Sequence, residues 1–137
     1  MPIEISLDEL NDSYQALVRL AQGRIPKEQH KLAYKLMRFY KQGKVGVDEM
    51  GESLRELMVK CGIEPGQPEV KAELMNEFNR LSKKFLRETR FYFTWGDPIP
   101  IQEIIDHVQI QDPITGTWGM ITAKDRGDLA WLFIEEE

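Results

Sequence analysis

The apolar residues of this chain recur at intervals of three and four through its first 88 residues, and they stop doing so near residue 89. Such intervals place side chains on one face of a helix, because an α-helix completes a turn in 3.6 residues. From residue 89 the chain is rich in aromatic residues, which are typical of strands. The pattern predicts an α+β fold that is predominantly α. In it, an N-terminal helical bundle or set of hairpins is followed by a small β element and a C-terminal helix.

The first predicted helix begins at a capping box, in which the Ser6 hydroxyl accepts from the Glu9 amide and the Glu9 side chain reaches back. Asp8 and Glu9 also suit the positive end of the helix dipole. One apolar stripe follows, made of Leu7, Leu10, Tyr14, Leu17 and Ala21. Gly23 is a typical terminator of such a helix.

Glycines divide the next helical segment. Pro26 suits the first turn of a second helix, because its missing donor costs nothing there. Gly43 and Gly46 predict the end or loosening of this helix, so that a third helix runs from about Val47 to Cys61. A loop over residues 63–68 and a fourth helix from about Pro68 to Arg87 complete the helical part.

The C-terminal part is predicted to contain short elements. Residues 89–95 form a strand, residues 101–107 a short helix, and residues 107–111 pair with residues 117–121 around a turn at 112–116. A terminal helix then starts near Thr122 and carries Leu129, Leu132 and Phe133. This part has few core residues of its own. We therefore expect it to pack on the helices of residues 1–88, giving one domain over 1–137.

The composition narrows the class of protein. A net charge of −5 argues against general phosphate binding by the whole molecule. The single cysteine, Cys61, cannot form an internal disulfide and lacks companions for a zinc site. Neither a signal-peptide pattern nor an apolar run of about 18 residues is present in the sequence. We expect a cytoplasmic protein that contacts no membrane.

No catalytic motif stands out in the sequence. His30 and His107 are the only histidines. No Cys, Asp or Glu stands three or four residues from His30, whereas Glu103 lies four residues before His107 and Asp106 directly precedes it. Residues 43–46 lack the spacing of a phosphate-binding loop. We expect neither an enzyme nor a cofactor or metal site.

An aromatic cluster is the first candidate binding feature. In a strand, Phe91, Phe93 and Trp95 face one way and Tyr92 the other. One set fills the core in the simplest interpretation, whereas an exposed tryptophan is a candidate anchor for a protein interface. The candidate interface residues are Phe91, Phe93, Trp95 and Trp118.

A basic stripe is the second candidate. Lys27, Lys31, Lys35 and Arg38 follow one another at steps of 4, 4 and 3 and so share a helical face. Such a face can contact nucleic-acid phosphates, or it can be a solvated surface paired with acids of neighbouring helices.

The order of segments resembles a loose family of short, mostly helical proteins of unassigned function that are encoded in tailed phages and prophages. The segments that carry the resemblance are Ile5–Leu10, Ala16–Leu20, Arg24–Pro26, Lys31–Arg38, Glu52–Gly62, Pro98–Ile101 and Ile121–Leu132. Family members run one unbroken helix through the region where this chain has Gly43, Gly46 and Gly51. The turn at residues 116–119 has no counterpart.

The resemblance implies a phage or prophage accessory protein in the host bacterial cell. Such a protein would act by protein–protein binding, either in particle assembly or as an inhibitor of a host protein. The alternative from the residues is a nucleic-acid-binding regulator that uses the basic stripe. The steps of 3 and 4 in the first apolar stripe also favour a homodimer, since they approach a heptad repeat.

Overall fold

The predicted mainly helical α+β fold is confirmed by the computed structural model, which describes residues 3–64, 66 and 69–135. Its helices are α1 (Leu7–Ala21), α2 (His30–Lys60), α3 (Ala72–Glu88), α4 (Ile101–His107) and α5 (Ala123–Asp128), with a 3₁₀ turn at Lys27–Gln29. Its strands are β1 (Ile3–Ser6), β2 (Arg90–Phe93), β3 (Ile99–Pro100), β4 (Ile110–Gln111), β5 (Trp118–Gly119) and β6 (Phe133–Ile134).

Helix α1 begins at the predicted cap. The Glu9 amide donates to the Ser6 hydroxyl at 3.1 Å, and the Glu9 carboxylate approaches the same hydroxyl at 3.4 Å. Leu10 and Leu17 of its apolar stripe are fully buried. Because Leu10 and Leu17 pack inside the chain, the spacing of this stripe is explained by the core and does not by itself indicate a homodimer.

Helix α2 is continuous, and the predicted break at Gly43 and Gly46 is wrong. Both glycines are buried where neighbouring side chains approach α2 closely. A Cβ at Gly46 would lie 2.6 Å from Cε2 of Phe91 and 2.8 Å from Cδ2 of Leu10. Each glycine costs the helix about 0.5–1 kcal/mol relative to alanine, and burial of the facing side chains offsets this cost. These glycines therefore admit neighbouring side chains instead of ending the helix.

The loop after α2 lies mostly where it was expected, but α3 starts later than predicted. Helix α3 begins at Ala72 instead of near residue 68. Pro65, Gln67 and Pro68 lie outside the described residues. Gly62 has a φ of 85° and follows the helix end, as expected for a residue that terminates a helix in the left-handed conformation.

The described residues form three two-stranded sheets, and two of these join distant parts of the chain. Strands β1 and β2 pair antiparallel with Ile3 opposite Phe93, and β3 pairs parallel to β6 with Ile99 opposite Phe133. Neither pairing was predicted from the sequence, and the strand expected over residues 89–95 is the shorter β2. The predicted β4–β5 hairpin is present with Ile110 opposite Gly119, but it is shorter than the predicted pairing of residues 107–111 with 117–121, since Gln109 bridges Arg24 instead.

The C-terminal residues pack on α1 and β2. The Trp131 ring stacks on Phe93 at 4.8 Å, and its indole nitrogen donates to the Ser13 hydroxyl at 3.2 Å. The terminal helix is shorter than predicted, and α5 ends at Asp128. Leu129 and Leu132 follow it and are both fully buried.

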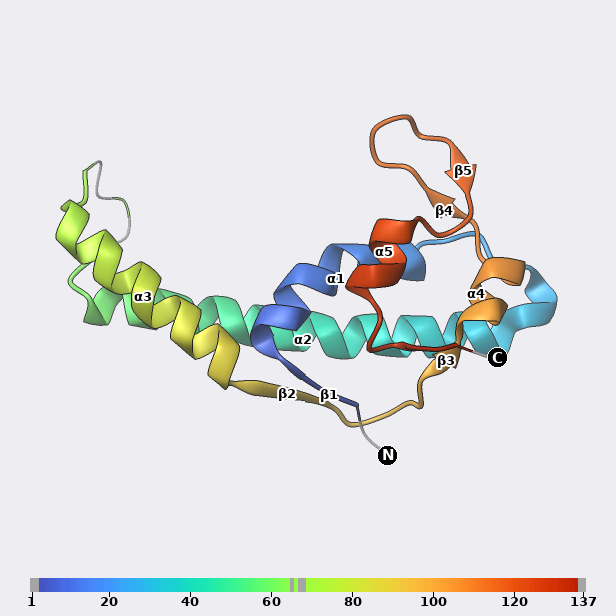
Figure 1. Cartoon of the computed structure of the whole chain (residues 1–137), viewed down its shortest axis with the longest axis horizontal. Helices are drawn as coiled ribbons and strands as arrows, with labels where there is room; N and C mark the ends of the chain where they lie inside the picture. Colours follow the sequence, from blue (N-terminus) through green and yellow to red (C-terminus); the bar gives the residue numbers. More distant parts are fainter. Residues whose placement is uncertain (1–2, 65, 67–68, 136–137) are drawn as a thin grey trace.

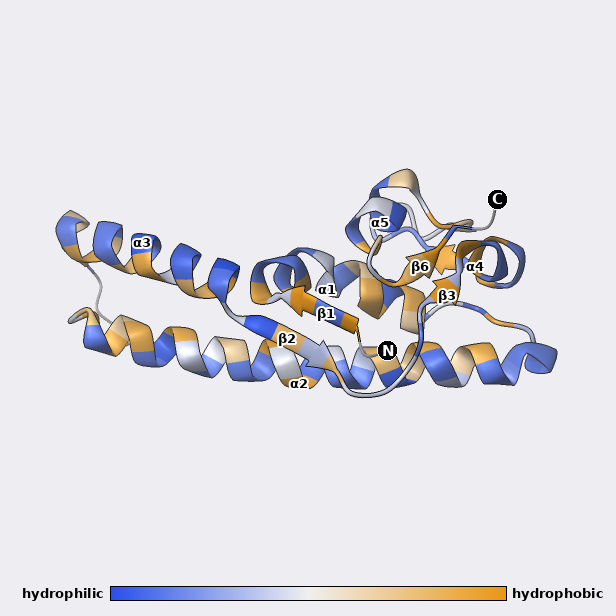
Figure 2. Cartoon of the chain, turned by 60° about the horizontal axis from the view of Figure 1, so that its bottom comes forward, coloured by the Kyte–Doolittle hydropathy of each residue, from blue (hydrophilic) through white to orange (hydrophobic). Residues whose placement is uncertain are grey.

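The molecule has two regions of different character, which we call the body and the arm. The body comprises residues 3–50 and 90–135, and it holds nearly all of the buried apolar side chains of the described chain. The arm comprises residues 51–60 of α2 together with α3, and it projects beyond the body in two views (Figure 1, Figure 2). No residue of α3 is fully buried.

Candidate functional site

A cationic aromatic cluster lies on the outer face of α2. Tyr34 and Trp95 meet edge to face, with ring centroids 5.6 Å apart at an interplanar angle of 86°. The Arg38 guanidinium lies 4.7 Å from the Trp95 ring centroid and 5.8 Å from that of Tyr34. These distances are within the range of cation–π attraction. Tyr34 is 56% exposed, so solvent or a partner reaches the cluster.

Two features of the fold hold Trp95 against α2. The Gln42 amide donates to the Trp95 carbonyl at 2.8 Å, and its oxygen accepts from the Trp95 amide at 3.1 Å. Gly96 has a φ of 108°, and a Cβ there would lie 2.7 Å from Cζ of the buried Phe39. The chain can pass Phe39 this closely only at a glycine. The indole is therefore positioned by backbone contacts before any partner binds.

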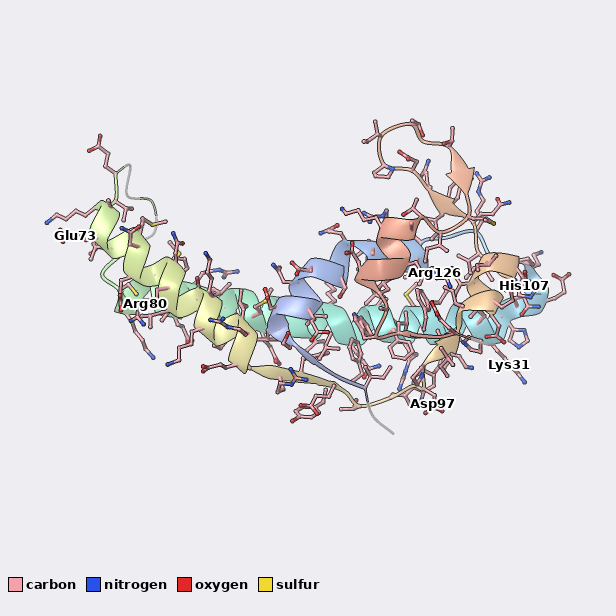
Figure 3. All side chains as sticks on the ribbon, in the orientation of Figure 1. Lys31, Glu73, Arg80, Asp97, His107 and Arg126 are labelled. Atoms are coloured by element: carbon pink, nitrogen blue, oxygen red, sulfur yellow. The ribbon has the colours of Figure 1, made fainter. Side chains whose placement is uncertain are left out.

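Basic side chains flank this cluster. Lys31 and Lys35 are exposed on α2, and Lys27 is exposed in the 3₁₀ turn that precedes it. Figure 3 labels Lys31 at the end of the molecule opposite the arm. Lys31, Lys35 and Arg38 thus lie on α2 as predicted, but Lys27 does not, because α2 begins at His30 instead of near Pro26. Arg38 differs from the lysines because its guanidinium stacks on Trp95.

The four aromatic residues predicted as an interface have different positions. Phe93 is fully buried in the core and is removed from the candidate interface. Phe91 is half-buried, and its ring meets Phe93 at 4.9 Å, so it packs chiefly inside the body. Trp95 and Trp118 are half-buried, and they lie in separate parts of the surface because Trp118 belongs to the β4–β5 hairpin.

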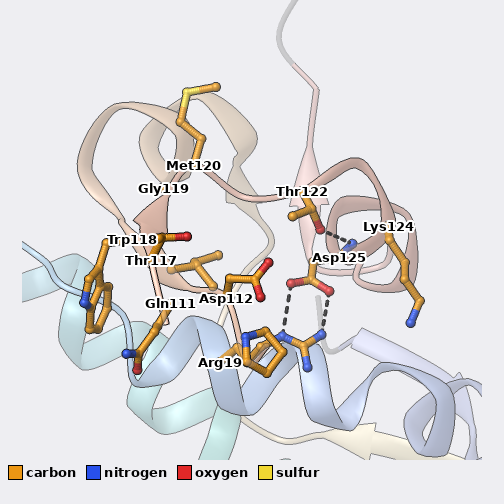
Figure 4. Close-up of a pocket in the computed structure, with 12 residues that line it drawn as sticks. Arg19, Gln111, Asp112, Thr117, Trp118, Gly119, Met120, Thr122, Lys124 and Asp125 are labelled. Carbon is orange, nitrogen blue, oxygen red and sulfur yellow. Dashed lines mark hydrogen bonds and ion pairs between the residues drawn. The ribbon is translucent and has the colours of Figure 1, made fainter. Parts of the chain in front are cut away.

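Trp118 lies beside a pocket of about 350 Å³ between the β4–β5 hairpin, α1 and α5 (Figure 4). The Arg24 guanidinium stacks 4.0 Å from the Trp118 ring centroid. Within the pocket, Arg19 Nη2 pairs with Asp125 Oδ1 at 2.6 Å, and this hydrogen bond raises the pKa of Arg19. Thr122 caps α5 by accepting from the Asp125 amide. The polar groups of Arg19, Thr122 and Asp125 thus form hydrogen bonds with one another, which indicates that they stabilise the fold.

Asp112 has a similar role in the hairpin turn. Its carboxylate accepts from the amides of Ile114 at 2.8 Å and Thr115 at 3.0 Å. The amides of Thr115 and Ile114 lower the pKa of Asp112. A carboxylate held ionised in this way fixes the turn and is a poor proton donor.

The described residues contain no group of three His, Cys, Asp or Glu side chains that could hold a metal ion. Within that part of the chain, no helix is long and apolar enough to cross a membrane. His107 lines a second pocket with Arg24, Asp106 and Met120, but Asp106 accepts from Gln102 at 2.8 Å. This pocket offers no nucleophile paired with a base.

Sequence reasoning missed three residues of the surface clusters. Tyr34 was not singled out, because it lies among apolar residues of the second predicted helix. Its position beside Lys35 and between Lys31 and Arg38 nevertheless places it on the side of the helix that carries the basic residues. Gln42 gave no signal, because its role depends on contact with Trp95, 53 residues away. Arg24 was recognised as a basic residue in the connection between helices, but its stacking on Trp118 was not predicted.

No protein-family model matches the chain, and neither the curated proteins nor the solved structures contain a significant match to it. The resemblance to phage-encoded proteins therefore stays a prediction.

Proposed function

We propose that this chain is a phage or prophage accessory protein that binds another protein through the cluster of Tyr34, Arg38 and Trp95. It acts in the cytoplasm of the host bacterium, in particle assembly or by inhibiting a host protein, and it needs no cofactor. The observation that carries the proposal is the stacking of these three side chains on an accessible face of α2. The continuous α2 also supports it, because the helix resembles the unbroken one of the phage family.

The chemistry of the cluster fits a protein interface. Tryptophan, tyrosine and arginine are the residue types that most often dominate binding energy at such interfaces. Gln42 and Gly96 fix the Trp95 backbone in advance, so binding loses little conformational freedom. The flanking Lys31 and Lys35 give this face a positive charge within a chain of net charge −5. We therefore expect the partner to present an acidic surface.

The proposal is tested by partner capture with matched variants. The tagged full chain is used to isolate partners from phage-infected or induced lysogenic cells, and binding is then measured with the purified partner. The double variant Tyr34→Ala/Arg38→Ala should bind at least about 30-fold more weakly, as expected for the loss of dominant contacts. Tyr92→Ala is the control, since Tyr92 is 55% exposed on β2. Equal partner binding by both variants would refute the proposed surface.

A second function is favoured by the exposed lysines. Lys31, Lys35 and Arg38 share the face of α2 that carries Tyr34, and Lys27 is exposed in the 3₁₀ turn before it. A basic row with an exposed aromatic ring can hold phosphates and stack a base. In this alternative the chain is a nucleic-acid-binding regulator. Gel-shift measurements at low salt should then show binding that falls steeply with salt and is abolished by Lys31→Glu/Lys35→Glu. Absence of any shift at low salt would exclude it.

A further inference from the structure

The arm exposes an apolar helix face that the chain itself covers only in part. Helix α3 places its large apolar side chains on one side, and every one of them is half-buried; they are Leu74, Met75, Phe78, Leu81, Phe85 and Leu86. Figure 2 shows this hydrophobic stripe along the side of α3 that is turned towards α2. A pair of helices cannot enclose its shared face, and bundles of four helices usually do so. Two further helices would therefore complete the cover of this apolar face.

A groove runs between the two helices of the arm. It has a volume of about 430 Å³, and its apolar lining includes Leu57 of α2 with Leu81 and Phe85 of α3. Two lysines and two glutamates also line it: Lys60 and Glu56 of α2, and Lys84 and Glu88 of α3. This combination of apolar and charged lining residues suits an amphipathic helix that carries both acidic and basic side chains along its edge.

Helix α3 itself has the charge distribution of such a helix. Its first half carries Glu73 and Glu77, and its second half carries Arg80, Lys83, Lys84 and Arg87, with Glu88 as the one acid there. A second α3 in the parallel direction would meet like charges. A second α3 in the antiparallel direction meets opposite charges at both ends, and the two helix dipoles then also attract. The charges of α3 are thus complementary to those of a second copy of itself.

We propose that α3 packs antiparallel against α3 of a second copy, so that each helix covers the groove of the other arm. A two-fold axis at Arg80 places Glu73 opposite Arg87 of the second copy and Glu77 within one residue of being opposite Lys84 of the second copy, and it brings the two copies of Arg80 together. The ion pair between Glu77 and Arg80 does not hinder this arrangement, because it can be kept at this exposed site and it offsets the repulsion between the two Arg80 side chains that meet at the axis. The result is a symmetric dimer closed by a four-helix bundle.

The size of the arm fits this assembly. A helix of 17 residues is about 25 Å long. Two such helices that also contact the α2 segments can reach the roughly 800 Å² per partner that stable interfaces bury. The cluster of Tyr34, Arg38 and Trp95 stays accessible, because Lys31 beside it and Glu73 of α3 lie at opposite ends of the molecule (Figure 3). The dimer therefore does not depend on the proposed partner site.

The test uses charge reversal in the full-length chain, with mass measured by light scattering after size-exclusion chromatography. The wild type should give twice the chain mass of 16.0 kDa at about 100 μM. The variant Glu73→Lys/Glu77→Lys and the variant Lys84→Glu/Arg87→Glu should each dimerise at least about 10-fold more weakly. An equimolar mixture of the two variants should form a heterodimer, because their charges are again complementary. Circular dichroism at matched concentration verifies that each variant is folded.

A cross-linking experiment gives an independent measurement. In a Cys61→Ser background, Arg80→Cys should form an intermolecular disulfide on mild oxidation, because the two copies of residue 80 lie beside the axis. Lys31→Cys is the matched control and should remain uncross-linked. A monomeric wild type at about 100 μM would overturn the proposal and assign the arm to a helix of a different protein. Dimers that persist in both charge-reversed variants would overturn it as well, because the interface would then lie outside α3.

Discussion

The two halves of α2 follow the same helical period but lie in different surroundings. In the first half, Leu36 and Phe39 are fully buried beneath α1 and the C-terminal elements. In the second half, Leu57 and Met58 are only half-buried beside α3. Helical spacing identifies the face that will be covered, but the amount of covering depends on how many other elements pack on it. The body thus has the packing of a complete core, whereas the arm does not.

This difference in burial determines whether an apolar side chain mainly stabilises the fold or remains available to contact another molecule. A buried leucine in the body stabilises the chain fully, since its contacts are already made. A half-buried leucine in the arm retains apolar surface that another molecule can still cover. Substitutions of one type should therefore have unequal effects in the two regions, and three comparisons test this.

The largest effect is expected from leucine truncation. Leu36→Ala in the body should lower the free energy of unfolding by about 2–5 kcal/mol, because it leaves a cavity at a fully buried position. Leu81→Ala in the arm should cost about 1 kcal/mol, because Leu81 is only half-buried. Urea denaturation at low micromolar protein concentration measures both. Equal costs would show that the arm is packed as tightly as the body.

A smaller effect, with opposite signs in the two regions, is expected from glycine replacement within α2. Gly46→Ala should destabilise the body by about 1–3 kcal/mol, because the new Cβ collides with Phe91 and Leu10. Gly51→Ala should stabilise the arm by about 0.5–1 kcal/mol, since its nearest neighbour is the flexible end of Arg55 at 3.7 Å. Thermal unfolding followed by circular dichroism distinguishes the two outcomes. A loss of stability in both variants would indicate that the arm around Gly51 is closely packed.

These glycines also show where sequence reasoning fails for the fold. The capping box at Ser6, the helix over residues 101–107 and the hairpin turn at 112–116 depend on neighbouring residues, and all three were predicted. The continuity of α2 depends on Leu10 and Phe91, which are far away in the sequence. The pairing of β3 with β6 likewise joins residues more than 30 positions apart. Local pattern cannot reveal either feature.

The candidate site likewise has features that the local sequence predicts and features that it does not. The basic stripe was predicted because helical spacing alone places Lys31, Lys35 and Arg38 together. The stacking of Arg38 on Trp95 was missed, because Trp95 reaches α2 only through the β1–β2 pairing and the hydrogen bonds to Gln42. Exposure also decides which aromatic residues can bind a partner, and alternation in a strand could not separate the buried Phe93 from the half-buried Trp95.

The smallest effect concerns two ion pairs with the same geometry. Arg19 Nη2–Asp125 Oδ1 in the body and Arg80 Nη2–Glu77 Oε1 in the arm both measure 2.6 Å, but the Asp125 side chain is 7% exposed and that of Glu77 is 50% exposed. The hydrogen bond from Arg80 lowers the pKa of Glu77. A depressed carboxyl pKa stabilises the folded chain above the unfolded pKa of about 4.3, and this contribution is lost as the pH falls through the folded value.

Glu77→Gln should thus lower the unfolding midpoint slightly at pH 7, and low pH or 1 M salt should remove the difference. Arg80→Gln, which deletes the same pair from its other side, should show the same pH and salt dependence. A difference that persists at pH 3 would mean that Glu77 acts through packing instead of charge, and the arm would then resemble the body.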